Sequence, residues 1–143
     1  MEGGKAVVDA SVVVKWFIEE EYSREARLLR DAYRDGLIDL IAPSLLPYEV
    51  LNALKYSNVF GEEELKEIAH ILDDFQITLY SIEGRLSELS VEIAYRKGVT
   101  IYDAAYVALA VESEAPLYTA DEKLLRKTRS TGLVRHISGF EIP

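Results

Sequence analysis

Short apolar runs alternate with longer segments of helical periodicity along this chain, and no other feature constrains its fold as much. Apolar and β-branched side chains predict buried strands at residues 5–8, 37–42, 77–80, 117–120 and 133–137. Apolar side chains at helical spacing predict helices at residues 11–18, 23–34, 43–54, 65–75, 83–97, 100–113 and 122–128. Strands that alternate with helices form a parallel sheet with helices on both faces. We therefore predict an α/β fold built on a parallel sheet.

The composition limits the class of protein. With 143 residues the chain is long enough for one hydrophobic core, and we expect a single domain over residues 1–143. No targeting segment is visible, and no apolar run approaches the ~18 residues that a membrane span requires. Together with the absence of cysteine, this predicts a soluble, cytoplasmic protein. Abundant charged residues with a single glutamine and two asparagines are typical of thermophile proteins.

The net charge of −9 argues against nonspecific binding to nucleic acid, which depends on a broad basic surface. A contact with nucleic acid would therefore have to be local. The candidate patch follows Asp121 and consists of Lys123, Arg126, Lys127 and Arg129. A solvated helix face is the simpler interpretation of these residues. If the patch does bind substrate, Lys123 is the candidate contact.

Four carboxylates stand where the pattern otherwise predicts buried core. Asp9 and Asp121 each directly follow a predicted strand, Asp103 begins a helix that is apolar almost all round, and Glu49 interrupts the apolar residues 45–51. An acid beside a core costs several kcal/mol unless it is paired, hydrogen-bonded or bound to a metal. Ligands of parallel sheets bind beyond the carboxyl ends of the strands. We interpret the four acids as one candidate site.

Three of these acids also have a structural interpretation as helix caps. Asp121 precedes a predicted helix and would cap it well, while Asp103 lies at capping-box spacing from Thr100. For these two acids, capping and function are balanced alternatives. Asp9 could also cap a helix, but we expect Ser11 to cap the first helix, which favours a functional role for Asp9.

Glu49 is the acid that a structural role explains least well. No basic residue lies three or four positions from it, so it has no partner on its own helix. Leu45, Glu49, Asn52 and Tyr56 share one stripe of that helix. Asn52, one turn beyond Glu49, could orient its carboxylate, which makes Asn52 a second candidate contact for substrate.

Repulsion decides what must accompany four converging acids. Two carboxylates about 5 Å apart repel by roughly 3 kcal/mol at an effective dielectric constant of about 20. Either some pKa values rise or a cation neutralises the group. Ligands that are all oxygen atoms select Mg²⁺ or Mn²⁺ over zinc, and such ions support hydrolysis of phosphodiester bonds.

Other catalytic machinery is scarce in the sequence. The chain has no cysteine nucleophile, no G-x-S-x-G segment and no phosphate-binding loop of the G-x-x-x-x-G-K-[ST] type. We expect His70 and His136 to be structural or exposed because neither stands near a second ligand candidate, and we expect Trp16 to lie in the core.

The four acids stand in segments that together resemble a known family. The segments are residues 8–12 (VDASV), 46–52 (LPYEVLN), 102–110 (YDAAYVALA) and 117–121 (LYTAD). In this order and spacing they resemble the PIN domain, and specifically the small stand-alone toxins of the VapBC type. The resemblance covers nearly the whole chain, and all four acidic positions of the family pattern are filled.

The resemblance implies a Rossmann-like, three-layer domain with about five parallel strands and an Mg²⁺- or Mn²⁺-dependent endoribonuclease activity. By analogy, Asp9 and Asp103 would be the principal metal ligands. Glu49 would activate or orient water, and Asp121 would complete the metal site.

The resemblance also implies secondary contacts and partners. Ser11 and Thr119 would be polar contacts near the substrate. Similar proteins form homodimers and are inhibited by a small antitoxin of the VapB type, whose basic segment reaches the acidic pocket. The net charge of −9 suits such a basic inhibitor.

Two competing functions remain open. The first is a non-catalytic PIN-like module that binds RNA or protein, in which the acids serve only as helix caps. The second is an aspartyl-phosphate phosphatase, which needs a second acid two positions after the nucleophile. The chain has Ser11 at that position, so the phosphatase ranks below the other two functions.

Overall fold

The computed structural model describes residues 4–143, which form a five-stranded sheet in the order β3-β2-β1-β4-β5. All neighbouring strands in this sheet are parallel. The strands are β1 (Gly4–Val8), β2 (Ile38–Pro43), β3 (Thr78–Tyr80), β4 (Leu117–Thr119) and β5 (Val134–His136). The predicted α/β fold and the predicted number of strands are confirmed.

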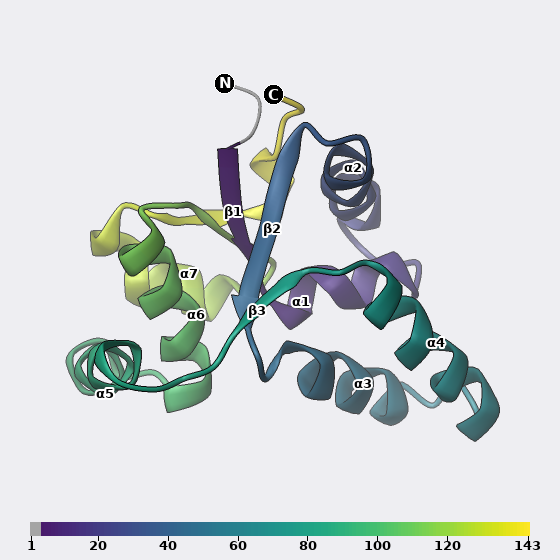
Figure 1. The fold of residues 1–143 in the computed structure, drawn as a ribbon, viewed down its shortest axis with the longest axis horizontal. Helices are drawn as coiled ribbons and strands as arrows, with labels where there is room; N and C mark the ends of the chain where they lie inside the picture. The colour runs from purple at the N-terminus through teal and green to yellow at the C-terminus, as the bar shows by residue number, and fades with distance from the viewer. Residues whose placement is uncertain (1–3) are drawn as a thin grey trace.

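In the described part of the chain, seven α-helices connect and cover the strands. They are α1 (Ala10–Val13), α2 (Ser23–Arg34), α3 (Leu46–Tyr56), α4 (Glu62–Asp74), α5 (Arg85–Lys97), α6 (Ile101–Ser113) and α7 (Glu122–Thr128). Helices α1 to α4 lie on one side of β1 and β2, and α5 to α7 lie on the other (Figure 1). The sheet is therefore the middle of three layers. Within residues 4–143, no helix is long and apolar enough to cross a membrane.

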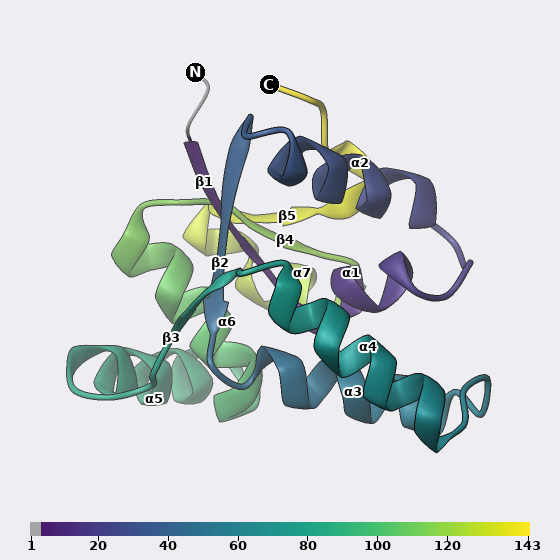
Figure 2. The ribbon, with the colours of Figure 1, turned by 45° about the vertical axis from the view of Figure 1, so that its right-hand side comes forward.

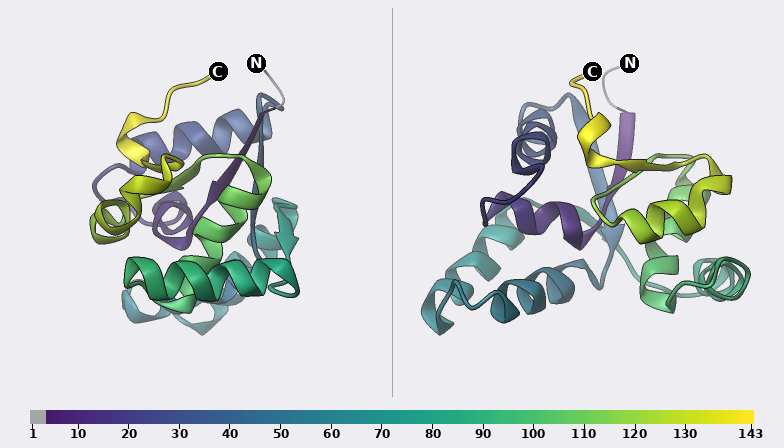
Figure 3. Two further views of the ribbon diagram at one scale, coloured as in Figure 1. Left: turned by 90° about the vertical axis from the view of Figure 1, so that its left-hand side faces the viewer. Right: turned by 180° about the vertical axis from the view of Figure 1, so that it is seen from behind.

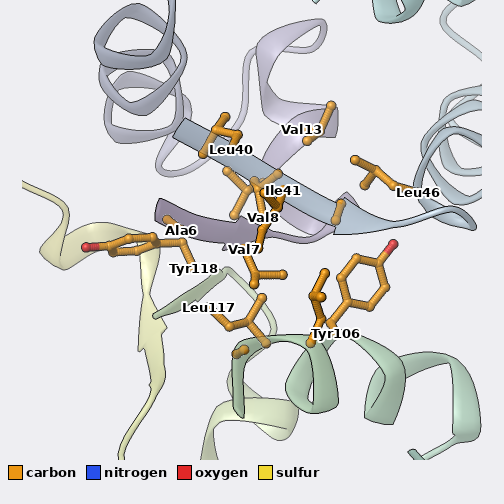
Figure 4. Close-up of a cluster of buried hydrophobic side chains, with 14 of the residues drawn as sticks. Ala6, Val7, Val8, Val13, Leu40, Ile41, Leu46, Tyr106, Leu117 and Tyr118 are labelled. Carbon is orange, nitrogen blue, oxygen red and sulfur yellow. The ribbon is translucent and has the colours of Figure 1, made fainter. Parts of the chain in front are cut away.

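The core lies on both faces of the two central strands. The consecutive side chains of β1 from Ala6 to Val8 are fully buried, as are those of Leu40 and Ala42 in β2. A strand covered by helices on both faces has no solvent side, which explains why these runs are apolar without alternation. Figure 4 shows these side chains packed between α1 on one side and α6 on the other.

The first helix differs from the prediction. Asp9, rather than Ser11, is its N-cap, because the Asp9 side chain accepts a hydrogen bond from the backbone N–H of Val12. The α-helix ends at Val13 and continues only as a 3₁₀ turn to Trp16, short of the predicted end near residue 18. Trp16 is buried, as expected, and its Nε1 donates to the carbonyl oxygen of Ala26 at 2.8 Å.

Two further expectations concern proline and histidine. Pro43 ends β2 instead of opening a helix, whereas Pro47 lies in the first turn of α3 as predicted. His70 is exposed, and the His136 side chain accepts a hydrogen bond from the backbone N–H of Ser138 at 3.1 Å. The prediction that both histidines are exposed or structural is confirmed.

The topology points the central strands toward one end of the molecule. The chain adds β2 and β3 on one side of β1 and then β4 and β5 on the other side. The order in which strands are added therefore reverses between β1 and β4. The start of β1 and the C-terminal residues lie at the end opposite α3 and α5 (Figures 2 and 3). The carboxyl ends of β1 and β4 therefore meet at the switch point where ligands of such sheets bind.

Candidate active site

The four acids predicted from the sequence line one pocket at the carboxyl ends of β1 and β4. The pocket has a volume of about 230 Å³, and its lining residues are Asp9, Ala10, Ser11, Glu49, Asp103, Tyr106 and Asp121. Each acid comes from a different segment: the β1–α1 junction, α3, α6 and the β4–α7 junction. Among the described residues, no lysine, arginine or histidine lines this pocket. The structure thus brings the four carboxylates together without a basic partner.

Asp9 is the most deeply placed of the four acids. Its side chain is only 6% exposed, and its Oδ1 accepts hydrogen bonds from Ser11 Oγ at 2.6 Å and from Val12 N at 3.3 Å. Burial raises the pKa of Asp9 to about 6, although the hydrogen bonds from Ser11, Thr119 and Val12 oppose the shift. The negative charge of Asp103 raises this pKa further. Asp9 therefore caps α1 and is also an acid with a raised pKa.

Ser11 and Thr119 join the two strand ends beneath the pocket. Ser11 Oγ lies 3.3 Å from Thr119 Oγ1 and accepts a hydrogen bond from Ala120 N at 2.8 Å. Thr119 is fully buried, and its Oγ1 accepts a hydrogen bond from Asp121 N at 3.0 Å. These contacts position Asp9 and Asp121 relative to each other. Ser11 lines the pocket, whereas the Thr119 side chain is buried beneath it and does not line it.

Glu49 enters the pocket from α3 and is held by a residue that the sequence analysis did not select. Tyr106 donates from its hydroxyl group to Glu49 Oε1 at 2.7 Å. Burial raises the pKa of Glu49, the Tyr106 hydrogen bond lowers it, and the charge of Asp103 raises it. Within residues 4–143 no hydrogen bond joins Asn52 to Glu49, and Tyr106 is the residue that holds this carboxylate in the structure. Asn52 is instead exposed in an adjoining pocket.

Asp103 and Asp121 complete the pocket and differ in their local roles. Thr100 caps α6 by accepting from Asp103 N at 3.0 Å. Burial and the charge of Asp121 raise the pKa of Asp103, while the Thr100 hydrogen bond and the charge of Lys123 lower it. Asp121 caps α7, because its Oδ1 accepts from Lys123 N at 3.0 Å and from Leu124 N at 3.1 Å. The capping role considered for Asp121 is therefore real.

The candidate basic contact lies beside the acids, not among them. Lys123 is exposed and lines a small hollow of about 100 Å³, together with Lys127, Asp103 and Asp121. Lys127 Nζ donates to the carbonyl oxygen of Gly98 at 2.8 Å. Because Asp103 and Asp121 line both this hollow and the acidic pocket, two basic groups flank one side of the carboxylates.

The donor set fits a hard divalent cation in its chemistry. Its ligand atoms would all be carboxylate oxygens, which Mg²⁺ and Mn²⁺ prefer. Burial, together with neighbouring carboxylates, raises the pKa values of Asp9, Glu49 and Asp103, so a bound cation would favour their charged forms. Over residues 4–143, however, no three acidic, histidine or cysteine side chains already lie close enough together to hold an ion.

Tyr106 is the functional candidate that the sequence analysis missed. It is 1% exposed, and Figure 4 shows it rising from α6 with its hydroxyl group directed away from Leu117. Burial and the nearby charge of Glu49 raise the pKa of Tyr106, so the hydroxyl group stays protonated and can only donate to that carboxylate. A signal was present in the sequence. Tyr106 is the only side chain with a polar group in the otherwise apolar segment 104–111.

Replacing Tyr106 by phenylalanine should separate its packing from its hydrogen bond. The ring would still fill the core, but Glu49 would lose its donor, so we expect a loss of about 1–3 kcal/mol in the free energy of unfolding at neutral pH. The pKa of Glu49 should rise further, because a bond to its charged form is gone. Chemical denaturation and a carboxyl-carbon NMR titration measure both effects. An unchanged Glu49 titration would show that Tyr106 does not hold this carboxylate.

The geometry defines a class: a parallel α/β domain with an acid-lined pocket at its topological switch point. The chain matches the family model of the PIN domain over residues 6–130. Ribonuclease VapC3 of Pyrobaculum aerophilum is 35% identical over 129 residues, covering 86% of this chain and 94% of that protein. Ribonuclease VapC1 of Mycobacterium tuberculosis is 34% identical over 123 residues, covering 84% and 88%. The chain belongs to the PIN domain family, in its VapC-type branch, which confirms the resemblance found in the sequence.

Solved structures show the same fold. PAE2754 from Pyrobaculum aerophilum superposes with a TM-score of 0.62 at 24% identity, covering 95% of this chain and 92% of that one. FitAB bound to an IR36 DNA fragment contains a chain that superposes with a TM-score of 0.67 at 14% identity, covering 95% and 97%. FitAcB from Neisseria gonorrhoeae gives 0.67 at 13% identity, covering 94% of this chain and 99% of that one. At these identities the likeness concerns the fold alone.

Proposed function

We propose that this protein is an Mg²⁺- or Mn²⁺-dependent endoribonuclease that hydrolyses phosphodiester bonds of RNA. The observation that carries the proposal is the pocket in which four carboxylates from four segments meet without a basic partner. Such a pocket is electrostatically incomplete and suits a divalent cation that also meets a phosphate. The names of the two curated relatives, both called ribonucleases, support the same activity.

The residues would divide the work as follows. Asp9 and Asp103 would be the principal ligands of the cation, and Asp121 would complete the site. The bound cation would supply Lewis-acid stabilisation of the phosphate charge. Glu49, with its raised pKa and its bond to Tyr106, would orient the attacking water and accept its proton.

The supporting side chains would position the acids and the substrate. Ser11 and Thr119 hold Asp9 and Asp121 at the junction of the two central strands. Lys123, beside Asp103, would contact a phosphate group of the RNA next to the one that is cleaved.

We further propose that the protein is the toxin of a type II toxin–antitoxin pair in the cytoplasm and forms a homodimer. A small VapB-type antitoxin with a basic segment would neutralise the acidic pocket, and the net charge of −9 favours such a partner. Co-expression with the product of a short reading frame upstream should yield a complex in which RNA cleavage is inhibited.

The nuclease proposal predicts Mn²⁺ binding coupled to cleavage. Calorimetry should detect Mn²⁺ binding at or below millimolar concentration, and total RNA should be cut in Mn²⁺ but not in EDTA. Affinity should fall as the pH is lowered, because protons compete for the carboxylates. The matched control is Asp74→Asn, which removes an exposed acid of α4 outside the pocket and should change nothing. RNA cleavage that continues in EDTA would refute the proposal.

A non-catalytic binding module is the second candidate, and two observations favour it. Asp9 and Asp121 are both helix caps, and no three candidate ligands within residues 4–143 are preassembled around one point. If the acids serve only as caps, Mn²⁺ should not bind in the millimolar range and RNA should stay intact. The calorimetric experiment therefore separates the two functions directly.

A further inference from the structure

A second pocket adjoins the acids on the side of α3. Its volume is about 590 Å³, and its lining residues are Leu45, Tyr48, Glu49, Asn52 and Tyr102. Glu49 lines the acidic pocket as well, so the two hollows meet at this carboxylate. We propose that the second pocket binds an unpaired base of single-stranded RNA, stacked on Tyr48 and Tyr102 beside the phosphate that is cleaved. This inference rests on the nuclease function proposed above and names the substrate contact of the same site.

The two tyrosines are placed as a stacking platform. Tyr48 is 77% exposed and Tyr102 is 65% exposed, so both rings are open to a ligand. Each directly precedes an acid of the pocket, Tyr48 before Glu49 in α3 and Tyr102 before Asp103 in α6. Because both pairs stand on helices, the backbone of each tyrosine is held next to that of its acid. Bases of single-stranded RNA are commonly bound by stacking on such aromatic side chains.

The remaining lining suits a neutral, hydrogen-bonding ring. Leu45 supplies an apolar surface, and the exposed amide of Asn52 can both donate to and accept from a base edge. The one charged lining residue is Glu49, whose Oε1 is already bonded to Tyr106. Since no basic side chain lines this pocket within the described part of the chain, a phosphate group would not be favoured there.

Positive charge lies beside the acids in a third hollow, which shares no lining residue with the aromatic pocket. The hollow with Lys123 and Lys127 meets the acidic pocket at Asp103 and Asp121. The three hollows therefore follow one another as an aromatic, an acidic and a basic section. A nucleotide strand presents the same order, with a base, the phosphate beside it and the next backbone phosphate. This match favours a single strand of RNA over a protein segment as the occupant.

A second copy of this chain is the competing occupant of the aromatic surface. Tyr56 of α3 and Tyr95 of α5 are also exposed, at 69% and 85%, and a tyrosine-rich face can bind protein. Neither of these two tyrosines lines the pocket beside the acids. Tyr95→Ala is therefore the matched control, because it removes an exposed tyrosine from a helix next to the site without altering the platform.

The test measures binding of short single-stranded RNA of mixed sequence by fluorescence anisotropy. Ca²⁺ takes the place of Mn²⁺ in this assay, and a gel shows that the RNA stays intact. Tyr48→Ala and Tyr102→Ala should each weaken binding by about 5- to 150-fold, the range found when a stacked base loses its aromatic partner. Tyr48→Phe, Tyr102→Phe and Tyr95→Ala should bind as the wild type does. Both platform side chains are exposed, so thermal melting of the variants should be unchanged.

A second arm replaces one base at a time by an abasic nucleotide. In the wild type, one position should weaken binding by a similar factor or more, and in the double variant Tyr48→Ala with Tyr102→Ala the same abasic position should have no further effect. If Mn²⁺-dependent cleavage occurs, the alanine variants should raise KM more than they lower kcat.

The outcomes separate this inference from the nuclease proposal. RNA that binds with the expected base dependence but is not cleaved in Mn²⁺ would reject the nuclease and keep the base pocket. RNA that is cleaved with unchanged KM by both alanine variants would keep the nuclease and reject the pocket. The inference is also overturned if Tyr48→Ala or Tyr102→Ala dissociates a dimer in sedimentation experiments while the abasic scan stays flat.

Discussion

Asp9→Asn should lower the rate of Mn²⁺-dependent RNA cleavage by at least about 100-fold, a loss typical for removal of one charge-stabilising group at a reacting centre. Asparagine keeps an oxygen that can accept from Val12 N and Ser11 Oγ, and it is as good an N-cap as aspartate. The fold should therefore persist while the charge that attracts the cation is gone. Initial cleavage rates at equal protein concentration, with circular dichroism as a check on folding, measure the effect.

Because asparagine still caps α1, Asp9→Asn is a more informative variant than Asp9→Ala. Alanine would remove the cap and the charge together, so a loss of activity could come from a disordered α1. Asp74→Asn again provides the control for removing one negative charge elsewhere. If Asp9→Asn cleaves RNA as fast as the wild type, Asp9 is a structural cap and the assigned metal ligand is wrong.

The second large effect is a loss of stability of the metal-free protein as the pH rises. The folded protein holds the Asp9 proton with a pKa of about 6, compared with an ordinary value of 3.8. Between these values the folded state binds more protons than the unfolded state, so raising the pH favours unfolding. The contribution is fully present below about pH 4 and is lost as the pH passes through about 6. At ~1.36 kcal/mol per pH unit, the loss amounts to about 3 kcal/mol.

Comparison with Asp9→Asn isolates this contribution from other titrations. The variant cannot ionise at this position, so its free energy of unfolding minus that of the wild type should grow by about 3 kcal/mol between pH 4 and pH 7. The raised pKa values of Glu49 and Asp103 act in the same direction but are present in both proteins. Urea denaturation in EDTA across this pH range provides the measurement.

Mn²⁺ should reverse the effect in the wild type. A ligand that binds only the folded state at 100 times its Kd stabilises by about 2.7 kcal/mol, which is close to the loss caused by the ionised acid. Asp9→Asn should gain much less from the same Mn²⁺ concentration. If the difference in the free energy of unfolding between the two proteins does not change with pH, the pKa of Asp9 is not raised in the metal-free pocket.

Local pattern was sufficient for most of the secondary structure. The predicted helix at residues 23–34 coincides with α2, and that at 122–128 coincides with α7. Gly98 ends α5 in the left-handed conformation that glycine adopts without strain. These features depend on neighbours within a few positions, which explains why periodicity and cap residues predicted them.

The cap of the first helix was predicted wrongly for a tertiary reason. Asp9 and Ser11 both carry oxygen atoms suitable for a cap, and the sequence does not show which of them accepts a hydrogen bond from the first turn of the helix. In the folded protein Asp9 N donates to the carbonyl oxygen of Tyr118 at 3.4 Å, across to β4. This contact holds the backbone of Asp9 extended just beyond β1, so that Asp9 becomes the N-cap and Ser11 donates to its carboxylate.

The sequence by itself determined the parallel α/β architecture, the four acids and the family, because each depends on residue type, periodicity or spacing along the chain. Only the tertiary structure decided that Tyr106, 57 positions from Glu49, holds that carboxylate, and that the pocket of Tyr48 and Tyr102 opens beside the acids. The reason is physical. Hydrogen bonds and pockets between α3 and α6 depend on how two helices distant in sequence approach each other, and no local pattern encodes that approach.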